Sequence, residues 1–107
     1  CMTKKESHIA KLISMRIKSQ DPGAEVILFG SHARGQANDE SDWDVLILID
    51  KPKTDRSIEE KYRNEMFQLE LELGEPISTF VYSKNDWETR YYHTPLYQNV
   101  KEEGIRL

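Results

Sequence analysis

The strongest constraint on the fold is an unbroken aliphatic run, Val45 to Ile49, which lies between Asp44 and Asp50. A strand that is exposed on one face alternates apolar and polar residues. A continuous run of aliphatic residues is instead typical of a strand that is buried on both faces. We therefore predict a central strand over Asp42 to Asp50.

A helix and a strand are predicted before this central strand. Thr3 and Glu6 have the spacing of a capping box, and apolar residues then recur at helical intervals until Asp21-Pro22-Gly23 interrupts them. The short run Glu25 to Phe29 is rich in residues that favour strands, and Gly30 ends it. The segment from Gly30 to Ser41 is predicted to be a tight turn followed by a loop.

Two helices and a strand are predicted to follow the central strand. Ser57 and Glu60 form a second potential capping box, before a stripe of apolar residues that Gly74 ends. The remaining predicted elements are a strand over Ile77–Tyr82, a helix starting near Ser83 and Asp86, a break over Tyr91–Pro95, and a last helix over Leu96–Glu103 that ends at Gly104.

This order of elements predicts an α+β fold in which a small mixed sheet of about three strands packs with helices. The first two strands are joined by too short a segment for a crossover helix, so they are either antiparallel or joined by one helical turn. At 107 residues we expect a single domain over 1–107.

Composition favours a folded domain and argues against nucleic acid as a ligand. Hydrophobic residues make up 37% and charged residues 32% of the chain, which is too apolar for a disordered chain. Lys plus Arg number 15 and Asp plus Glu number 19, giving a net charge of −4. The chain has no overall basic field, so we expect no direct binding to nucleic acid.

The sequence also suggests a cytoplasmic location. Cys1 is the single cysteine, which excludes an internal disulfide and fits a reducing compartment. No apolar run approaches the roughly 20 residues of a membrane span, and the first ten residues lack a secretory apolar stretch. We therefore expect no membrane association.

Asp42 and Asp44 are the first candidate site residues. Strand side chains alternate between the two faces, so these carboxylates share a face and Trp43 points the other way. Neighbouring carboxylates repel unless a cation lies between them, and Mg²⁺ commonly binds such oxygen pairs. The spacing therefore predicts a magnesium site.

Gly30 and Ser31 are the second candidate. They lie where a strand ends and a turn begins, a place where backbone N–H groups are available and a ligand can approach the main chain closely. Arg34 would add charge or hold the turn. Because Mg²⁺ usually binds through carboxylates together with substrate phosphates, the two candidates together predict a metal–nucleotide site.

The combined pattern resembles a known family. Gly30-Ser31-x-Ala33-Arg34-Gly35, followed by Ser41-Asp42-x-Asp44 and an aliphatic strand, is similar to the minimal nucleotidyltransferases of the DNA polymerase β superfamily. The resemblance implies that Gly30 and Ser31 hold the triphosphate and that Asp42 and Asp44 bind Mg²⁺. It further implies transfer of a nucleoside monophosphate from an NTP, here expected to be ATP, to a hydroxyl.

The resemblance also implies a partner. Small bacterial proteins of this kind are often antitoxins of a helical HEPN-type ribonuclease, and some neutralise it by adding AMP to a tyrosine. Active members carry a third carboxylate on the strand after the long helix, where this chain has Ser78 and Thr79. Glu75 or Asp86 replaces it only if the backbone presents one of them to the site.

Several alternatives remain open. A site without a third acid suits a binding module that neutralises its partner by contact alone, and a small-molecule modifier generally needs a further substrate-binding domain. His32 is interpreted as an exposed loop residue. The basic first helix and the acidic long helix are either partner surfaces or solvated faces. A homo-oligomer is possible.

Overall fold

A computed structural model describes residues 2–107, so Cys1 lies outside the described part of the chain. The fold is α+β, as predicted, with a mixed sheet of four strands in the order β3-β2-β1-β4. The elements are α1 (Lys4–Gln20), β1 (Glu25–Phe29), α2 (Ser31–Arg34), β2 (Trp43–Ile49), α3 (Arg56–Leu73), β3 (Ile77–Ser83), α4 (Lys84–Thr89), α5 (Pro95–Glu103) and β4 (Ile105–Arg106).

The first two strands satisfy both of the alternatives left open by the sequence. β1 and β2 are antiparallel, with Phe29 opposite Asp44, and the single-turn helix α2 begins the connection between them. β2 and β3 are parallel, and α3 supplies the crossover between them. The count of about three strands was one too low because β4 is only two residues long and pairs with β1 after the last helix.

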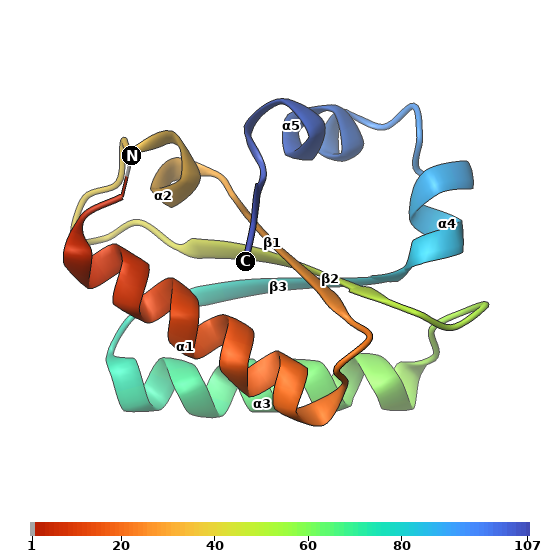
Figure 1. Cartoon of the computed structure of the whole chain (residues 1–107), viewed down its shortest axis with the longest axis horizontal. Coiled ribbons are helices and arrows are strands. Elements are labelled where there is room, and N and C mark those ends of the chain that lie inside the picture. The colour runs from red at the N-terminus through yellow and green to blue at the C-terminus, as the bar shows by residue number, and fades with distance from the viewer. Residues whose placement is uncertain (1) are drawn as a thin grey trace.

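β2 is buried on both faces, as its aliphatic run predicts. Val45, Ile47 and Ile49 face the core under α1 and α3, whereas Leu46 and Leu48 face the smaller core under α4 and α5. Figure 1 shows α1 and α3 together on one side of the sheet and α4 and α5 on the other. The alternation of strand side chains therefore assigns every residue of β2 to one of two layers.

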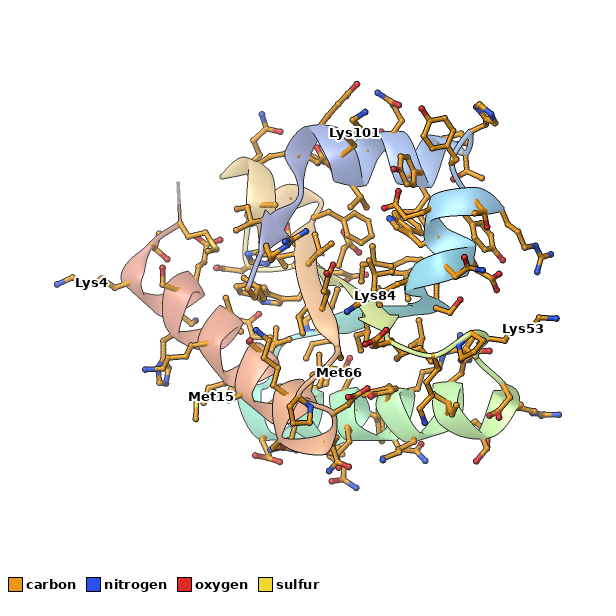
Figure 2. The ribbon with its side chains drawn as sticks, turned by 45° about the vertical axis from the view of Figure 1, so that its right-hand side comes forward. Lys4, Met15, Lys53, Met66, Lys84 and Lys101 are labelled. Atoms are coloured by element: carbon orange, nitrogen blue, oxygen red, sulfur yellow. The ribbon has the colours of Figure 1, made fainter. Side chains whose placement is uncertain are left out.

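The helices bury one stripe each. In Figure 2 the Met66 side chain of α3 lies on the side that faces the sheet, and Met15 projects away from α1. Met66 is 1% exposed, while Met15 is 57% exposed. This is the amphipathic pattern expected for helices that cover one face of a sheet.

The predicted start of the long helix was wrong by two residues. Asp55, and not Ser57, is the N-cap of α3, and its carboxylate accepts a hydrogen bond from the Ile58 N–H at 2.9 Å. Ser57 lies within the first helical turn. Both residue types cap helices well, so the sequence alone did not distinguish between them.

The charged helix faces are partly used inside the fold. Arg16 of α1 donates to both carboxylate oxygens of Glu72 on α3 at 2.9 Å, and lies 3.5 Å from Glu65. The basic first helix and the acidic long helix thus attract each other across their contact. Within residues 2–107, every helix is too short or too polar to cross a lipid bilayer.

Replacing the cap tests the observed helix start. Asp55→Ala is expected to lower the free energy of unfolding by about 1 kcal/mol, because the first turn of α3 loses an acceptor for a backbone N–H. Urea denaturation followed by circular dichroism measures the change. Ser57→Ala, two residues away, is the matched control and should change stability by less than about 0.5 kcal/mol. A larger loss for Ser57→Ala than for Asp55→Ala would contradict the assignment.

Candidate functional site

The alternation of β2 determines where the two aspartates lie. Asp44 has the same parity as Leu46 and Leu48, so it lies on the face that carries α4 and α5. It lies at the start of the strand, where its carboxylate is half-buried. Trp43 points to the opposite face and is fully buried under α1.

Gly30 joins the end of β1 to α2 directly beside Asp44. Its backbone has φ 80° and ψ −157°, a combination that is essentially restricted to glycine. A Cβ at this position would overlap the Asp44 carboxylate and lie 3.0 Å from its Cγ. The glycine therefore allows the turn and the carboxylate to approach closely.

Arg34, at the end of α2, lies over the same turn. Its guanidinium is within 3.5 Å of the Ser31 hydroxyl and donates from Nε to the Gln36 side chain at 3.3 Å. The sequence left open whether Arg34 supplies charge or holds the turn. Arg34 hydrogen-bonds to neighbouring side chains. Its positive charge also lowers the pKa of Asp44, although burial and the Asp42 charge raise that pKa by more.

A residue that the sequence did not single out completes this group. Glu103, the last residue of α5, accepts hydrogen bonds from Arg34 Nη1 at 3.1 and 3.2 Å. Its Oε1 also accepts from the Gly30 N–H at 3.3 Å. Glu103 is separated from Gly30 by most of the chain, and only the pairing of β4 with β1 brings them together, so no local sequence signal indicated it.

The interpretation of His32 as an exposed loop residue was wrong. His32 is 6% exposed, and its ring stacks on the Trp43 indole with centroids 3.8 Å apart. Its Nδ1 lies 2.6 Å from Glu6 Oε2. His32 thus fixes α2 to the sheet and to α1, because α2 is a single helical turn whose inner side faces Trp43.

Ser78, where the family resemblance led us to expect a third carboxylate in active members, lies beside both aspartates. In the parallel register of β2 and β3 it is the partner of Asp44, and its hydroxyl lies 3.3 Å from Asp42 Oδ2. Asp86 follows β3 at the opposite end of the strand. Glu75 pairs with Lys5 and borders a pocket that Trp43 also lines, on the other face of the sheet. Neither acid is positioned to replace the missing one.

The electrostatics of the site are those of crowded acids. Burial raises the pKa of Asp44, the Asp42 charge raises it further, and Glu103 adds a smaller contribution in the same direction. Arg34 and His32 partly offset these effects. A half-buried carboxylate beside a second carboxylate is stabilised by a cation.

A divalent cation fits this donor set only with help from a ligand. Among residues 2–107 there is no cluster of three or more His, Cys, Asp or Glu side chains able to hold a metal ion. Asp42 and Asp44 supply two hard oxygen donors, and Mg²⁺ typically completes such a set with water and substrate phosphates. The residues present therefore fit a Mg²⁺ ion that arrives with a phosphate-bearing ligand.

The family model of the nucleotidyltransferase domain matches residues 10–107. The chain belongs to this family. The match includes the Gly30 turn and both aspartates, so the resemblance seen in the sequence is confirmed at the level of the family. No curated protein sequence matches the chain significantly.

Two solved structures share the fold of this nucleotidyltransferase domain. A crystal structure of a toxin–antitoxin with AMP-PNP has a TM-score of 0.64 at 20% identity, over 92% of this chain and 70% of that chain. A structure of a mutant of the toxin–antitoxin MntA–HpeT has a TM-score of 0.65 at 21% identity, with 92% and 70% covered. At this level of identity, the similarity shows the fold alone.

Adding a methyl group to Gly30 tests the close approach of the turn to Asp44. Gly30→Ala is expected to lower the free energy of unfolding by about 1–3 kcal/mol from backbone strain, and further because the new Cβ overlaps the carboxylate. Gly74→Ala is the matched control: Gly74 also has a positive φ, of 71°, but nothing lies within 4 Å of the added Cβ. Chemical denaturation of both variants measures the difference. Equal losses would contradict the contact.

The Glu6–His32 contact should make stability depend on pH. The pKa of Glu6 is lowered from 4.5, first by the Thr3 backbone N–H and then by His32. Glu6 therefore stabilises the fold above pH 4.5, and this stabilisation is lost as the pH falls through the lowered pKa. Glu6→Gln keeps a capping-box residue but removes the charge, so it should cost about 1 kcal/mol at pH 7.

Denaturation of Glu6→Gln and of the unchanged protein between pH 7 and pH 3 measures this effect. The difference in stability between them should shrink as the pH falls. Glu40→Gln, at an exposed loop position, is the control for the loss of one negative charge. A difference that stays constant across this range would show that the Glu6 charge does not contribute.

Proposed function

We propose that this chain binds Mg-ATP and transfers AMP to a hydroxyl on a partner protein, as the antitoxin of a HEPN-type toxin. The observation that carries the proposal is the close approach of the Asp44 carboxylate to the Gly30 turn, beside the Asp42 charge and the Arg34 guanidinium. Phosphate donors and cation ligands are thereby combined in one small site.

Each group of residues has a distinct role in this proposal. The backbone turn at Gly30, the Ser31 hydroxyl and Arg34 bind and orient the phosphates. Asp42 and Asp44 hold Mg²⁺, which when bound neutralises phosphate charge and so stabilises the transition state. The Ser78 hydroxyl orients Asp42 by its hydrogen bond.

The reaction is an in-line displacement at the α-phosphorus. The acceptor hydroxyl oxygen forms a bond to this phosphorus, the bond to the bridging oxygen breaks, and pyrophosphate leaves with its electron pair. The proton of the hydroxyl passes to solvent or to a carboxylate of the partner, because Ser78 is not a base at neutral pH. Without a base at this position, we expect slow transfer until the partner is bound.

The solved structures support the choice of nucleotide and partner. One of them is a toxin–antitoxin with AMP-PNP, an adenine nucleotide analogue, and the other includes MntA. The proposal assigns the same kind of ligand and partner to this chain. The location that goes with it is the cytoplasm, where both ATP and such a toxin are found.

A second candidate function follows from the missing acid. The register partner of Asp44 is Ser78, and it carries no negative charge for a second metal or for activation of the hydroxyl. In this alternative the chain binds nucleotide but neutralises its partner by contact alone. The two functions differ in one measurable event, the appearance of AMP on the partner.

Labelled ATP distinguishes the two candidates. The chain is incubated with Mg²⁺, ATP labelled at the α-phosphate, and the protein encoded by the adjacent reading frame. We expect label on that protein, and Asp44→Ala should reduce its rate of appearance by about 100-fold or more, because charge stabilisation by a bound metal is worth several kcal/mol.

Asp50→Ala is the matched control, since Asp50 is exposed at the other end of the same strand. It should leave the labelling rate unchanged. Inhibition of the partner without label, equally by the unchanged chain and by Asp44→Ala, would favour the contact-only function. Neither label nor inhibition would contradict both.

A further inference from the structure

The Glu103 carboxylate lies on the groups that are proposed to bind phosphate. α5 ends at Glu103, Gly104 follows, and β4 then pairs with β1 so that Leu28 is opposite Ile105. Continuing this antiparallel register by two residues brings Glu103 opposite Gly30. A Cβ on Gly104 would overlap the Val100 carbonyl oxygen of α5 and lie 2.9 Å from Ile27 Cγ2 of β1, so a glycine is needed where α5 ends against β1.

The contacts of Glu103 are those of an anion in its binding site. Its Oε1 accepts from the Gly30 N–H at 3.3 Å and from Arg34 Nη1 at 3.1 Å, and its Oε2 accepts from the same nitrogen at 3.2 Å. The Glu103 side chain is 23% exposed, while that of Arg34 is 41% exposed. A backbone N–H and a guanidinium on one carboxylate make charge-assisted hydrogen bonds, as they would on a phosphate.

These donors cannot all serve two anions at once. The Gly30 amide has one hydrogen, so it bonds either to Glu103 or to a phosphate oxygen. Arg34 has further N–H groups, but a second anion beside Glu103 would be repelled by it. Glu103 also adds negative charge near Asp44, whose carboxylate is already repelled by Asp42.

We propose that Glu103 is an internal competitor of the nucleotide, a carboxylate that occupies the Gly30 and Arg34 donors and that the triphosphate must displace. The inference rests on the proposed function and adds a regulatory contact to it. Displacement requires only local movement, because β4 is two residues long and lies at the edge of the sheet. In the nucleotide-bound state, the junction between α5 and β4 is therefore released from the turn.

The apparent affinity for nucleotide then depends on the fraction of molecules in which the site is open. Removing the competing charge should raise that fraction. Glu103→Gln and Glu103→Ala weaken one partly exposed ion pair and one backbone hydrogen bond, so both variants should bind Mg-ATP roughly 3- to 10-fold more tightly. Inorganic pyrophosphate should show the same gain, since the effect is on the phosphate donors.

Isothermal titration calorimetry of the full chain with Mg-ATP and with pyrophosphate measures these affinities. Glu102→Gln is the matched control: it removes the same charge one residue away, and the exposed Glu102 side chain accepts a hydrogen bond from Gln98 on the same helix. It should bind as the unchanged chain does. Figure 2 shows the ribbon of α5, with Lys101 labelled, along which these neighbouring residues lie.

A second measurement requires no nucleotide. The Gly30 amide resonance in a ¹⁵N-correlated NMR spectrum should shift in Glu103→Gln, because the N–H loses its carboxylate acceptor, and should stay in place in Glu102→Gln. Thermal unfolding of both Glu103 variants shows whether they are folded, and Glu103→Gln is the more conservative of the two.

The outcomes separate the inference from the function on which it rests. Equal affinities in the Glu103 variants and the unchanged chain would overturn the inference and leave the nucleotide-binding function standing. Weaker binding would also overturn it, and would make Glu103 a supporting ligand of the site. Absence of nucleotide and pyrophosphate binding in every variant would overturn both.

Discussion

The whole arrangement depends on one strand that is covered on both faces. Burial of successive aliphatic residues of β2 under two helical layers fixes its parity, because a shift by one residue would exchange every side chain between the layers. The same alternation places the Asp44 side chain on the face of Leu46 and Leu48. The large apolar contribution of the strand thus holds a half-buried carboxylate in place next to the Gly30 turn, although the acid itself is destabilised there.

The site consequently contains locally unfavourable interactions within a fold whose other features agree with one another. The strand, helices and caps all favour the same structure, while the crowded acids and the glycine-only turn are locally unfavourable. Such departures from local consistency are typical of functional sites. In this chain the unfavourable contacts are limited to the region where the end of β1, the start of β2 and the end of α5 meet. The apolar layers on both faces of the sheet compensate for their cost.

The sequence predicted most of this because its strongest signals are local. The aliphatic run identified β2, glycines marked the ends of β1 and α3, and the spacing of Asp42 and Asp44 placed them on a shared face. What it missed depends on tertiary contacts. Glu103 reaches Gly30 only through the pairing of a two-residue strand, and His32 is buried only because Trp43 lies beneath it.

The stack of His32 on Trp43 has a mechanical consequence. The indole lies in the core under α1, and Glu6 of this helix lies 2.6 Å from the imidazole that stacks on the indole. The Gly30 turn is thus held in place by Glu6, a side chain near the start of the described residues. Removing the chain up to and including Glu6 would therefore loosen the Gly30 turn, which α2 continues.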